Sequence, residues 1–148
     1  MPDVCAAIGL AQIGKYGSYL LPERKRVAEG YYRQFCKYSW AQLPLLKDGN
    51  TESSYHLFAL RIKGITEAQR DAIIEEITLY NIAVNVHFIP MPMLTIFRDM
   101  GYDITNHPVA YDNYSREISL PIYPQLSDEQ VDYIVDAVIN SYNKVVSK

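Results

Sequence analysis

The sequence has no excess of positive charge, because 14 lysines and arginines face 17 aspartates and glutamates for a net charge of -3. Proteins that bind nucleic acid need a basic surface against the phosphates, so we expect no nucleic acid partner. No apolar run approaches the roughly 20 residues that span a bilayer, and no signal-peptide pattern is present. We therefore expect no membrane association and a cytoplasmic location.

Residues that commonly build reactive or metal centres are scarce, with two cysteines and three histidines. Cys5 and Cys36 lie far apart in sequence, which predicts reduced, buried thiols of a cytosolic protein. The histidines and cysteines do not have the spacing of a metal site. A glycine-rich phosphate loop, a G-x-S-x-G motif and an H-E-x-x-H motif are all missing. From the residues alone we predict no catalytic residues and no metal ligands.

What the sequence does contain is enough apolar material for a core, because 49% of its 148 residues are hydrophobic. This length and composition fit one domain. Thirteen tyrosines are a high number. Tyrosine combines an apolar ring with a polar tip, which suits interfaces and ligand clefts, but the same residues could lie at the edge of a core.

Two helices are predicted at the start of the chain. Val4–Ile13 is rich in small residues, and Gly14 and Gly17 should break or bend this helix. Pro22 can begin a second helix, because proline is tolerated in a first helical turn. The buried face of the second helix is predicted from apolar residues at a spacing of four: Val27, Tyr31 and Phe35.

Two later helices are marked by capping boxes, in which Thr66 pairs with Gln69 and Ser127 pairs with Gln130. The first should run to about Tyr80, and the second carries an apolar stripe of helical period to the end of the chain. Short helices are predicted over 93–100 and 109–116. On the first capped helix, the residues expected to face water are Arg70, Asp71, Glu75 and Glu76.

Three strands are predicted, at Tyr55–Ile62, Val84–Ile89 and Glu117–Leu120. The first is apolar on both faces, which favours a central position in a sheet. With the helix between them, the first two strands would form a β-α-β unit, although the sequence does not fix strand directions. Residues 39–54 are predicted to be a loop. These elements indicate an α+β or α/β fold, with two leading helices and a small sheet covered by helices.

The most informative stretch is IAVNVHFIPMP, over 82–92. Alternation along a strand would place Val84, Val86 and Phe88 on the core, and Asn85, His87 and Ile89 on the opposite face. Pro90 and Pro92 would end the strand. His87 is then either a half-buried residue bonded to a nearby carbonyl or an imidazole held against a ligand. For His56 the residues favour a structural histidine with a hydrogen-bond partner over a ligand contact.

Several segments of the chain resemble one known family. They are MPDVCAAIGLAQI, ERKRVAEGYYRQF, SSYHLFALRI, IAVNVHFIPMP, FRDMGYD and REISLPIYPQLSDEQV. In this order, they resemble the C-terminal part of the DegT-type sugar aminotransferases, which are pyridoxal-phosphate enzymes of fold type I. The resemblance covers nearly all 148 residues. It implies a small, mainly antiparallel three-stranded sheet packed with helices, the C-terminal small domain of such an enzyme.

The resemblance implies transfer of an amino group, usually from glutamate, to a keto-sugar attached to a nucleotide, in polysaccharide or lipopolysaccharide biosynthesis. Such enzymes carry pyridoxal 5'-phosphate on a lysine. No lysine here stands in the family's lysine motif, which the resemblance puts upstream of the matched region. We therefore expect 1–148 to be a single small domain with leading interdomain helices, without the catalytic lysine domain. Alone it should bind no cofactor and transfer no amino group. Family enzymes are dimers, so we expect a homodimer or self-association.

The resemblance also gives substrate-side candidates. It implies that His87 and Pro90 face the mouth of the active site, and Asn85 and His56 are further candidates for substrate binding. Two other interpretations stay open. One is a stand-alone small-molecule-binding or interaction module without catalysis, and the other is a structural remnant with no ligand.

Overall fold

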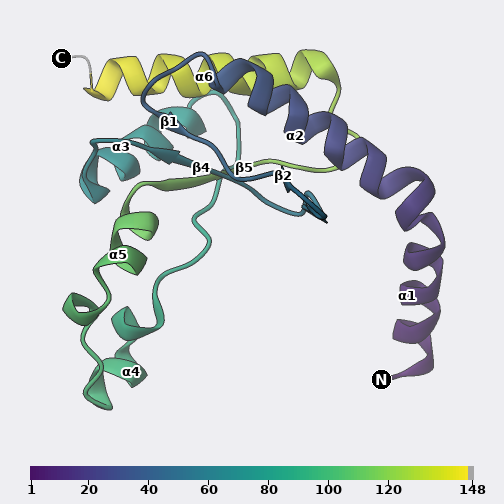
Figure 1. Ribbon diagram of the computed structural model, residues 1–148, viewed down its shortest axis with the longest axis horizontal. Coiled ribbons are helices and arrows are strands. Elements are labelled where there is room, and N and C mark those ends of the chain that lie inside the picture. The colour runs from purple at the N-terminus through teal and green to yellow at the C-terminus, as the bar shows by residue number, and fades with distance from the viewer. Residues whose placement is uncertain (147–148) are drawn as a thin grey trace.

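A computed structural model describes residues 1–146 (Figure 1). In chain order the helices and strands are α1 (Asp3–Lys15), the π-helical η1 (Tyr16–Leu20), α2 (Leu21–Phe35), β1 (Ala41–Gln42), β2 (Lys47–Asp48), β3 (Thr51–Glu52), β4 (Phe58–Ile62), α3 (Glu67–Thr78), the 3₁₀ helix η2 (Met91–Met93), α4 (Thr95–Asp99), the 3₁₀ helix η3 (Ile104–Asn106), α5 (Pro108–Ser115), β5 (Glu117–Leu120) and α6 (Asp128–Val146).

The main sheet has three antiparallel strands in the order β1-β4-β5. Strand β4 is central, as its two apolar faces predict, and Phe58, Leu60 and Ile62 are fully buried. It pairs with β5 so that Phe58 lies opposite Leu120 and Arg61 opposite Glu117. The expectation of a small antiparallel three-stranded sheet packed with helices is confirmed.

One of the three predicted strands is wrong. Residues 84–89 make only an isolated bridge between Asn85 and Ser119, so the β-α-β unit does not form. Side chains take the backbone donors that a ladder would need, because the Val86 N–H donates to Asn85 Oδ1 at 2.8 Å and the His87 N–H donates to Glu117 Oε2 at 2.9 Å. Phe88, predicted to lie on the core, is 73% exposed.

The third strand comes instead from residues that were predicted to be a loop. Ala41 and Gln42 form β1 and pair with Ile62 and Arg61 of β4. Within the same stretch, β2 and β3 form a separate two-stranded hairpin. Two-residue strands are too short to show the alternation on which a strand prediction depends.

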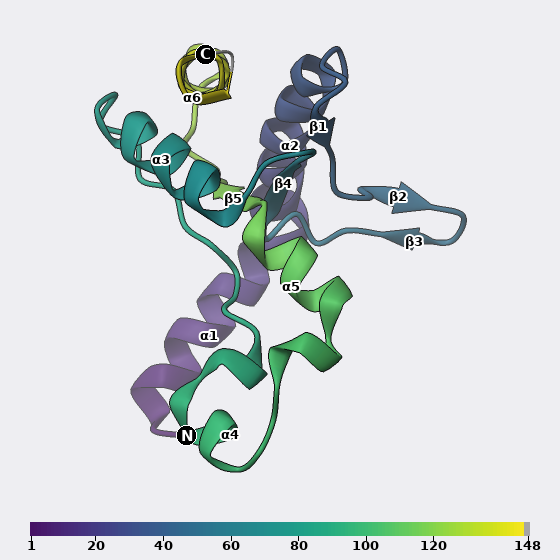
Figure 2. The same ribbon diagram turned by 90° about the vertical axis from the view of Figure 1, so that its left-hand side faces the viewer.

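Helices α2, α3 and α6 provide the rest of the core, with α2 and α3 both beside α6 (Figures 1 and 2). The predicted buried face of α2 is confirmed, since Val27, Tyr31 and Phe35 have no exposed surface. Gly30 permits the close approach of α6, because an added Cβ would lie 3.1 Å from Val131 Cγ1. On α6, the core residues are Val131, Ile134, Val135, Ala137 and Val138.

Both predicted capping boxes form. Thr66 Oγ1 accepts the Gln69 N–H at 3.3 Å, and Gln69 Oε1 accepts the Thr66 N–H at 2.9 Å. Ser127 and Gln130 make the same exchange at the start of α6. The prediction that Arg70 faces water is wrong, because its side chain is only 2% exposed.

Helix α1 and the α4–α5 segment both extend away from the same side of the sheet, at opposite ends of the molecule (Figure 1). The chain bends through η1, where Gly17 lies, as the two glycines predict. No residue of α1 is buried.

Cys5 and Cys36 are free but exposed, which corrects the prediction of buried thiols. Within residues 1–146, no helix has the length and apolarity needed to cross a membrane.

The only tryptophan of the sequence connects the segment before β1 to the last helix. Trp40, just before β1, stacks on Tyr142 of α6 with ring centroids 4.3 Å apart and planes 17° from parallel. Phe35 meets the same indole edge-on at 6.1 Å. These contacts attach the chain between α2 and β1 to the last helix.

Candidate functional site

A depression of about 330 Å³ lies where β5 meets the segment that follows α3. We call it the histidine groove, and its lining residues are His56, Leu57, Ala83, Val84, Asn85, His87, Ser119, Leu120, Pro121 and Ile122. Three of the four substrate-side candidates from the sequence are therefore together in one place. Pro90 is outside the lining.

The groove owes its position to β5, which is buried along its whole length. Asn85 and Ser119 exchange two backbone hydrogen bonds, with N···O distances of 3.2 Å from Asn85 to Ser119 and 2.7 Å in return. This single bridge fixes residues 82–87 beside the strand. Because the chain leaves the sheet directly afterwards, His87 lies at the groove instead of in a ladder.

His87 is held by two side chains of β5. Its Nδ1 lies 2.9 Å from the Ser119 hydroxyl, and that hydroxyl donates to Glu117 Oε1. The other carboxylate oxygen of Glu117 accepts the backbone N–H of His87 at 2.9 Å. Glu117 and Ser119 are each 4% exposed, while His87 is half-buried. The imidazole is therefore half-buried, as one of the two interpretations of the sequence has it, but its partner is a buried hydroxyl and not a carbonyl.

Sequence reasoning missed Glu117 and Ser119. The signal was available, because residues i and i+2 of a strand share a face, and a carboxylate and a hydroxyl on one face of a short buried strand need partners. What the sequence does not provide is the partner, since His87 is 30 residues before Glu117.

The other candidates are placed differently. His56 is exposed, two residues before β4 begins, so the predicted buried structural role is wrong. Asn85 is also exposed, and its Oδ1 accepts the Val86 N–H. Pro90 is the residue before η2, and its carbonyl accepts the Met93 N–H at 2.8 Å. Pro90 therefore ends the segment that carries His87 and starts the chain toward α4.

Tyr31 fixes the far wall of the groove. Its hydroxyl donates to the carbonyl oxygen of Pro121 at 2.8 Å. Burial in the core raises the pKa of the Tyr31 phenol far above its ordinary value. The phenol is therefore neutral and remains a donor, which holds the chain leaving β5 against α2.

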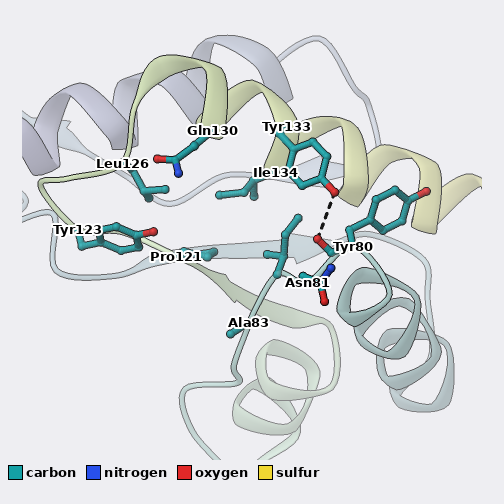
Figure 3. Close-up of a pocket in the computed structure, with 10 residues that line it drawn as sticks. Tyr80, Asn81, Ala83, Pro121, Tyr123, Leu126, Gln130, Tyr133 and Ile134 are labelled. Carbon is teal, nitrogen blue, oxygen red and sulfur yellow. Dashed lines mark hydrogen bonds between the residues drawn. The ribbon is translucent and has the colours of Figure 1, made fainter.

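A second, larger depression lies between α6 and the segment that follows α3 (Figure 3). This tyrosine pocket, of about 500 Å³, shares Ala83 and Pro121 with the groove, and its other lining residues are Tyr80, Asn81, Ile82, Tyr123, Leu126, Gln130, Tyr133 and Ile134. The Tyr133 hydroxyl donates to the Tyr80 carbonyl at 3.2 Å across it. Its lining contains no carboxylate, imidazole or other basic side chain, so the histidine groove is the better candidate for chemistry or polar recognition.

The lysines of the described residues lie away from the histidine groove. Lys25 pairs with Glu52 at 2.7 Å and Lys144 with Glu76 at 2.6 Å, while Lys63 donates to the Ser39 carbonyl at 3.1 Å. Residues 1–146 also contain no group of three or more His, Cys, Asp or Glu that could hold a metal.

Comparison with known proteins identifies the family. The profile of the DegT/DnrJ/EryC1/StrS aminotransferase family matches residues 1–139. The chain belongs to this family. A Methanocaldococcus jannaschii protein of uncharacterised function, MJ1066, is 34% identical over 150 residues, covering 100% of this chain and 37% of its own length. The spore coat polysaccharide biosynthesis protein SpsC of Bacillus subtilis is 30% identical, covering 93% of this chain and 36% of SpsC.

Solved aminotransferase structures match the fold. Spr1654 of Streptococcus pneumoniae, which has been assigned to the sugar aminotransferases, superposes with a TM-score of 0.94 and 39% identity, over 99% of this chain and 36% of that one. PseC of Helicobacter pylori, an aminotransferase of pseudoaminic acid biosynthesis, gives a TM-score of 0.79 and 27% identity over 93% of this chain and 36% of its own. The chain thus spans little more than a third of the relatives that it matches. The family comparison confirms the resemblance of the sequence motifs to sugar aminotransferases of fold type I.

Proposed function

We propose that this chain forms the substrate-side domain of a pyridoxal-phosphate-dependent aminotransferase acting on a nucleotide-linked keto-sugar. The observation that carries the proposal is the family match over residues 1–139. Relatives include a dTDP-3-amino-3,6-dideoxy-α-D-galactopyranose transaminase of Aneurinibacillus thermoaerophilus and a GDP-perosamine synthase of Vibrio cholerae. A biosynthetic role in a surface polysaccharide, with glutamate as amino donor, is part of the same proposal.

The domain's contribution would be binding and orientation, because no lysine lines the histidine groove. Pyridoxal phosphate, when bound by the complete enzyme, supplies the electron sink for amino transfer. The related Spr1654 has been solved in a PLP-form and a PMP-form. In this chain, His87 is the residue for which we propose a direct contact with the sugar, since its ring lines the groove and is fixed from behind. His56 and Asn85 would lie at the rim, and Pro90 would direct the chain past the site.

We also propose that 1–148 is one small domain that works as part of a homodimer in the cytoplasm. Free cysteines favour a reducing compartment, since disulfides form mainly in oxidising ones. In such a homodimer, the second copy would cover helix α1, of which no residue is buried.

A chimera tests the proposal. The part of Spr1654 that superposes on this chain is replaced by the chain, and amino transfer from glutamate is followed with a panel of UDP-, dTDP- and GDP-linked keto-sugars. We expect activity from the chimera and none from the 148-residue chain alone. His87→Ala in the chimera should raise KM about tenfold, the effect of losing roughly 1.4 kcal/mol of binding.

His107→Ala is the matched control, because His107 is exposed beside α5 and does not line the groove. An equal rise in KM for both variants would contradict a contact from His87. A chimera that folds and takes up the cofactor but transfers no amino group to any of the sugars would contradict the proposed function. Tight binding of a nucleotide-sugar by the chain alone, measured by calorimetry, would instead support a stand-alone binding module.

A further inference from the structure

The side chain of Glu117 is buried, at 4% exposure, and forms no ion pair among the described residues. Its two oxygens accept hydrogen bonds from the backbone N–H of His87 and the Ser119 hydroxyl. Both carboxyl oxygens are acceptors in these contacts, so both neighbours have to be donors.

This requirement fixes the direction of every proton in the chain of contacts. A serine hydroxyl has one proton, and Ser119 gives that proton to Glu117. The hydroxyl can then only accept from the imidazole nitrogen that lies 2.9 Å away, which is Nδ1 of His87. Nδ1 must therefore carry a proton. In the neutral imidazole this leaves Nε2 without one, as a hydrogen-bond acceptor.

We propose that Glu117 and Ser119 are positioning residues that hold neutral His87 as the Nδ1–H tautomer, so that Nε2 accepts a hydrogen bond from a hydroxyl group of a sugar ligand in the histidine groove. The ligand part rests on the proposed function, while the tautomer part rests only on the three side chains. The backbone bridge between Asn85 and Ser119 makes the arrangement rigid, because it fixes the main chain on both sides of the contact.

The test reads the tautomer directly, by two-bond ¹H–¹⁵N correlation spectra of the ¹⁵N-labelled 148-residue chain without ligand, about two units above the ordinary imidazole pKa of about 6.5. The chain has three histidines, and His56→Gln and His107→Gln assign two of them by elimination. We expect the His87 signals to show a protonated Nδ1 and an unprotonated Nε2. A protonated Nε2 in the wild-type chain would overturn the proposal.

Glu117→Gln gives the sharpest contrast, because it keeps the shape and changes the donors. In this variant the amide oxygen of the new side chain must accept the backbone N–H of His87, so its NH₂ group faces Ser119 and donates to the hydroxyl. Ser119 then donates to Nδ1, and the tautomer inverts to Nε2–H. Glu75→Gln on the exposed side of α3 is the control and should leave the spectrum unchanged. An unaltered tautomer in Glu117→Gln would contradict the proposal.

Variants of Ser119 give a second measurement in case Glu117→Gln does not fold. Ser119→Ala removes the hydroxyl and should reduce the population of the Nδ1–H form, while Ser119→Thr keeps the hydroxyl and should restore it. A Ser119→Ala chain with the wild-type tautomer would again contradict the proposal. Since these spectra need no ligand, failure here leaves the sugar-binding test with the chimera intact, and failure of that test leaves the tautomer result intact.

Discussion

Arg70 is buried to 2% exposure although its guanidinium group is charged. Its Nη1 donates to the carbonyls of Tyr114 at 2.8 Å and of Glu117 at 3.3 Å, and the guanidinium lies 4.9 Å from the centre of the Tyr114 ring. It thereby connects α3 to α5 and to the strand that holds His87. The prediction from the sequence failed because it followed residue type, whereas the spacing from Arg70 to Ile73 and Ile77 already placed all three on one helical face.

Arg70→Ala should lower the free energy of unfolding by about 2–4 kcal/mol, because it leaves buried carbonyls without a donor and opens a cavity. Urea unfolding followed by circular dichroism measures the loss. Arg98→Ala is the control, since Arg98 is exposed on α4 and bonds only Thr95 at 3.3 Å, and it should cost no more than about 0.5 kcal/mol. Equal losses in the two variants would refute the structural role of Arg70.

Tyr31 should make stability fall at alkaline pH. Burial raises its pKa in the folded chain, so the contribution is complete below the unfolded pKa of about 10 and is lost progressively as the pH rises from there toward the raised folded pKa. We expect wild-type unfolding free energy to drop more steeply than that of Tyr31→Phe between about pH 9 and about pH 11. Tyr102→Phe, at an exposed position, should keep the wild-type slope. Parallel curves for wild type and Tyr31→Phe would count against this assignment.

At the scale of elements, local signals predicted the helices better than the strands. Caps act through neighbouring residues, so Thr66 with Gln69 and Ser127 with Gln130 could be read directly from sequence. Strand pairing depends on partners that are distant in the chain. Residues 84–89 have strand composition, but side chains of Asn85 and Glu117 bind their backbone N–H groups, and no local pattern reveals that competition.

Thr66→Ala should destabilise the chain by about 1 kcal/mol, because the first turn of α3 loses the acceptor for the Gln69 N–H. The loss should appear as a lower melting midpoint in calorimetry. Thr78→Ala at the other end of α3 serves as the control, since its hydroxyl bonds only the Glu75 carbonyl near the exposed helix end. A Thr66→Ala midpoint as high as that of Thr78→Ala would mean that the cap contributes nothing.

For the whole molecule, the most consequential feature is that α1 is apolar around its circumference. Its charges are confined to Asp3 and Lys15 at the two ends. At about 100° per residue, Val4 and Ile8 project from nearly the opposite side to Ile13, and Val4, Ile8, Leu10 and Ile13 are 71%, 59%, 74% and 74% exposed. A helix that is hydrophobic on every side is normally buried, so α1 is built to be covered by other protein.

The 148-residue chain should therefore self-associate through α1. Size-exclusion chromatography with light scattering should show a mass above that of the 17.0 kDa monomer, falling toward it in Ile8→Glu/Leu10→Glu. Leu79→Glu introduces one negative charge at a 72% exposed apolar position next to α3 and should leave the mass unchanged. A monomer at high concentration, or an equal effect of the control, would contradict the role of α1.

The candidate site was predicted in part. Alternation and the prolines directed attention to His87, and the structure groups it with His56 and Asn85 in one groove. The residues that orient the imidazole could not be found in the same way, because Glu117 and Ser119 acquire their roles only when β5 lies beside residues 85–87. The same limit applies to pyridoxal phosphate, which was inferred from family motifs and not from any group in this chain.

The contact between Trp40 and Tyr142 supplies an optical signal for these experiments. Because the chain has a single indole, its fluorescence emission comes from one known position. That indole stacks face to face on the last helix, so emission should change when α6 separates from the chain between α2 and β1. Fluorescence excited in the tryptophan band will thus follow the docking of the C-terminal helix, while circular dichroism follows the helices themselves. A fluorescence transition that precedes the circular dichroism transition would identify α6 as a part that separates before the remainder unfolds.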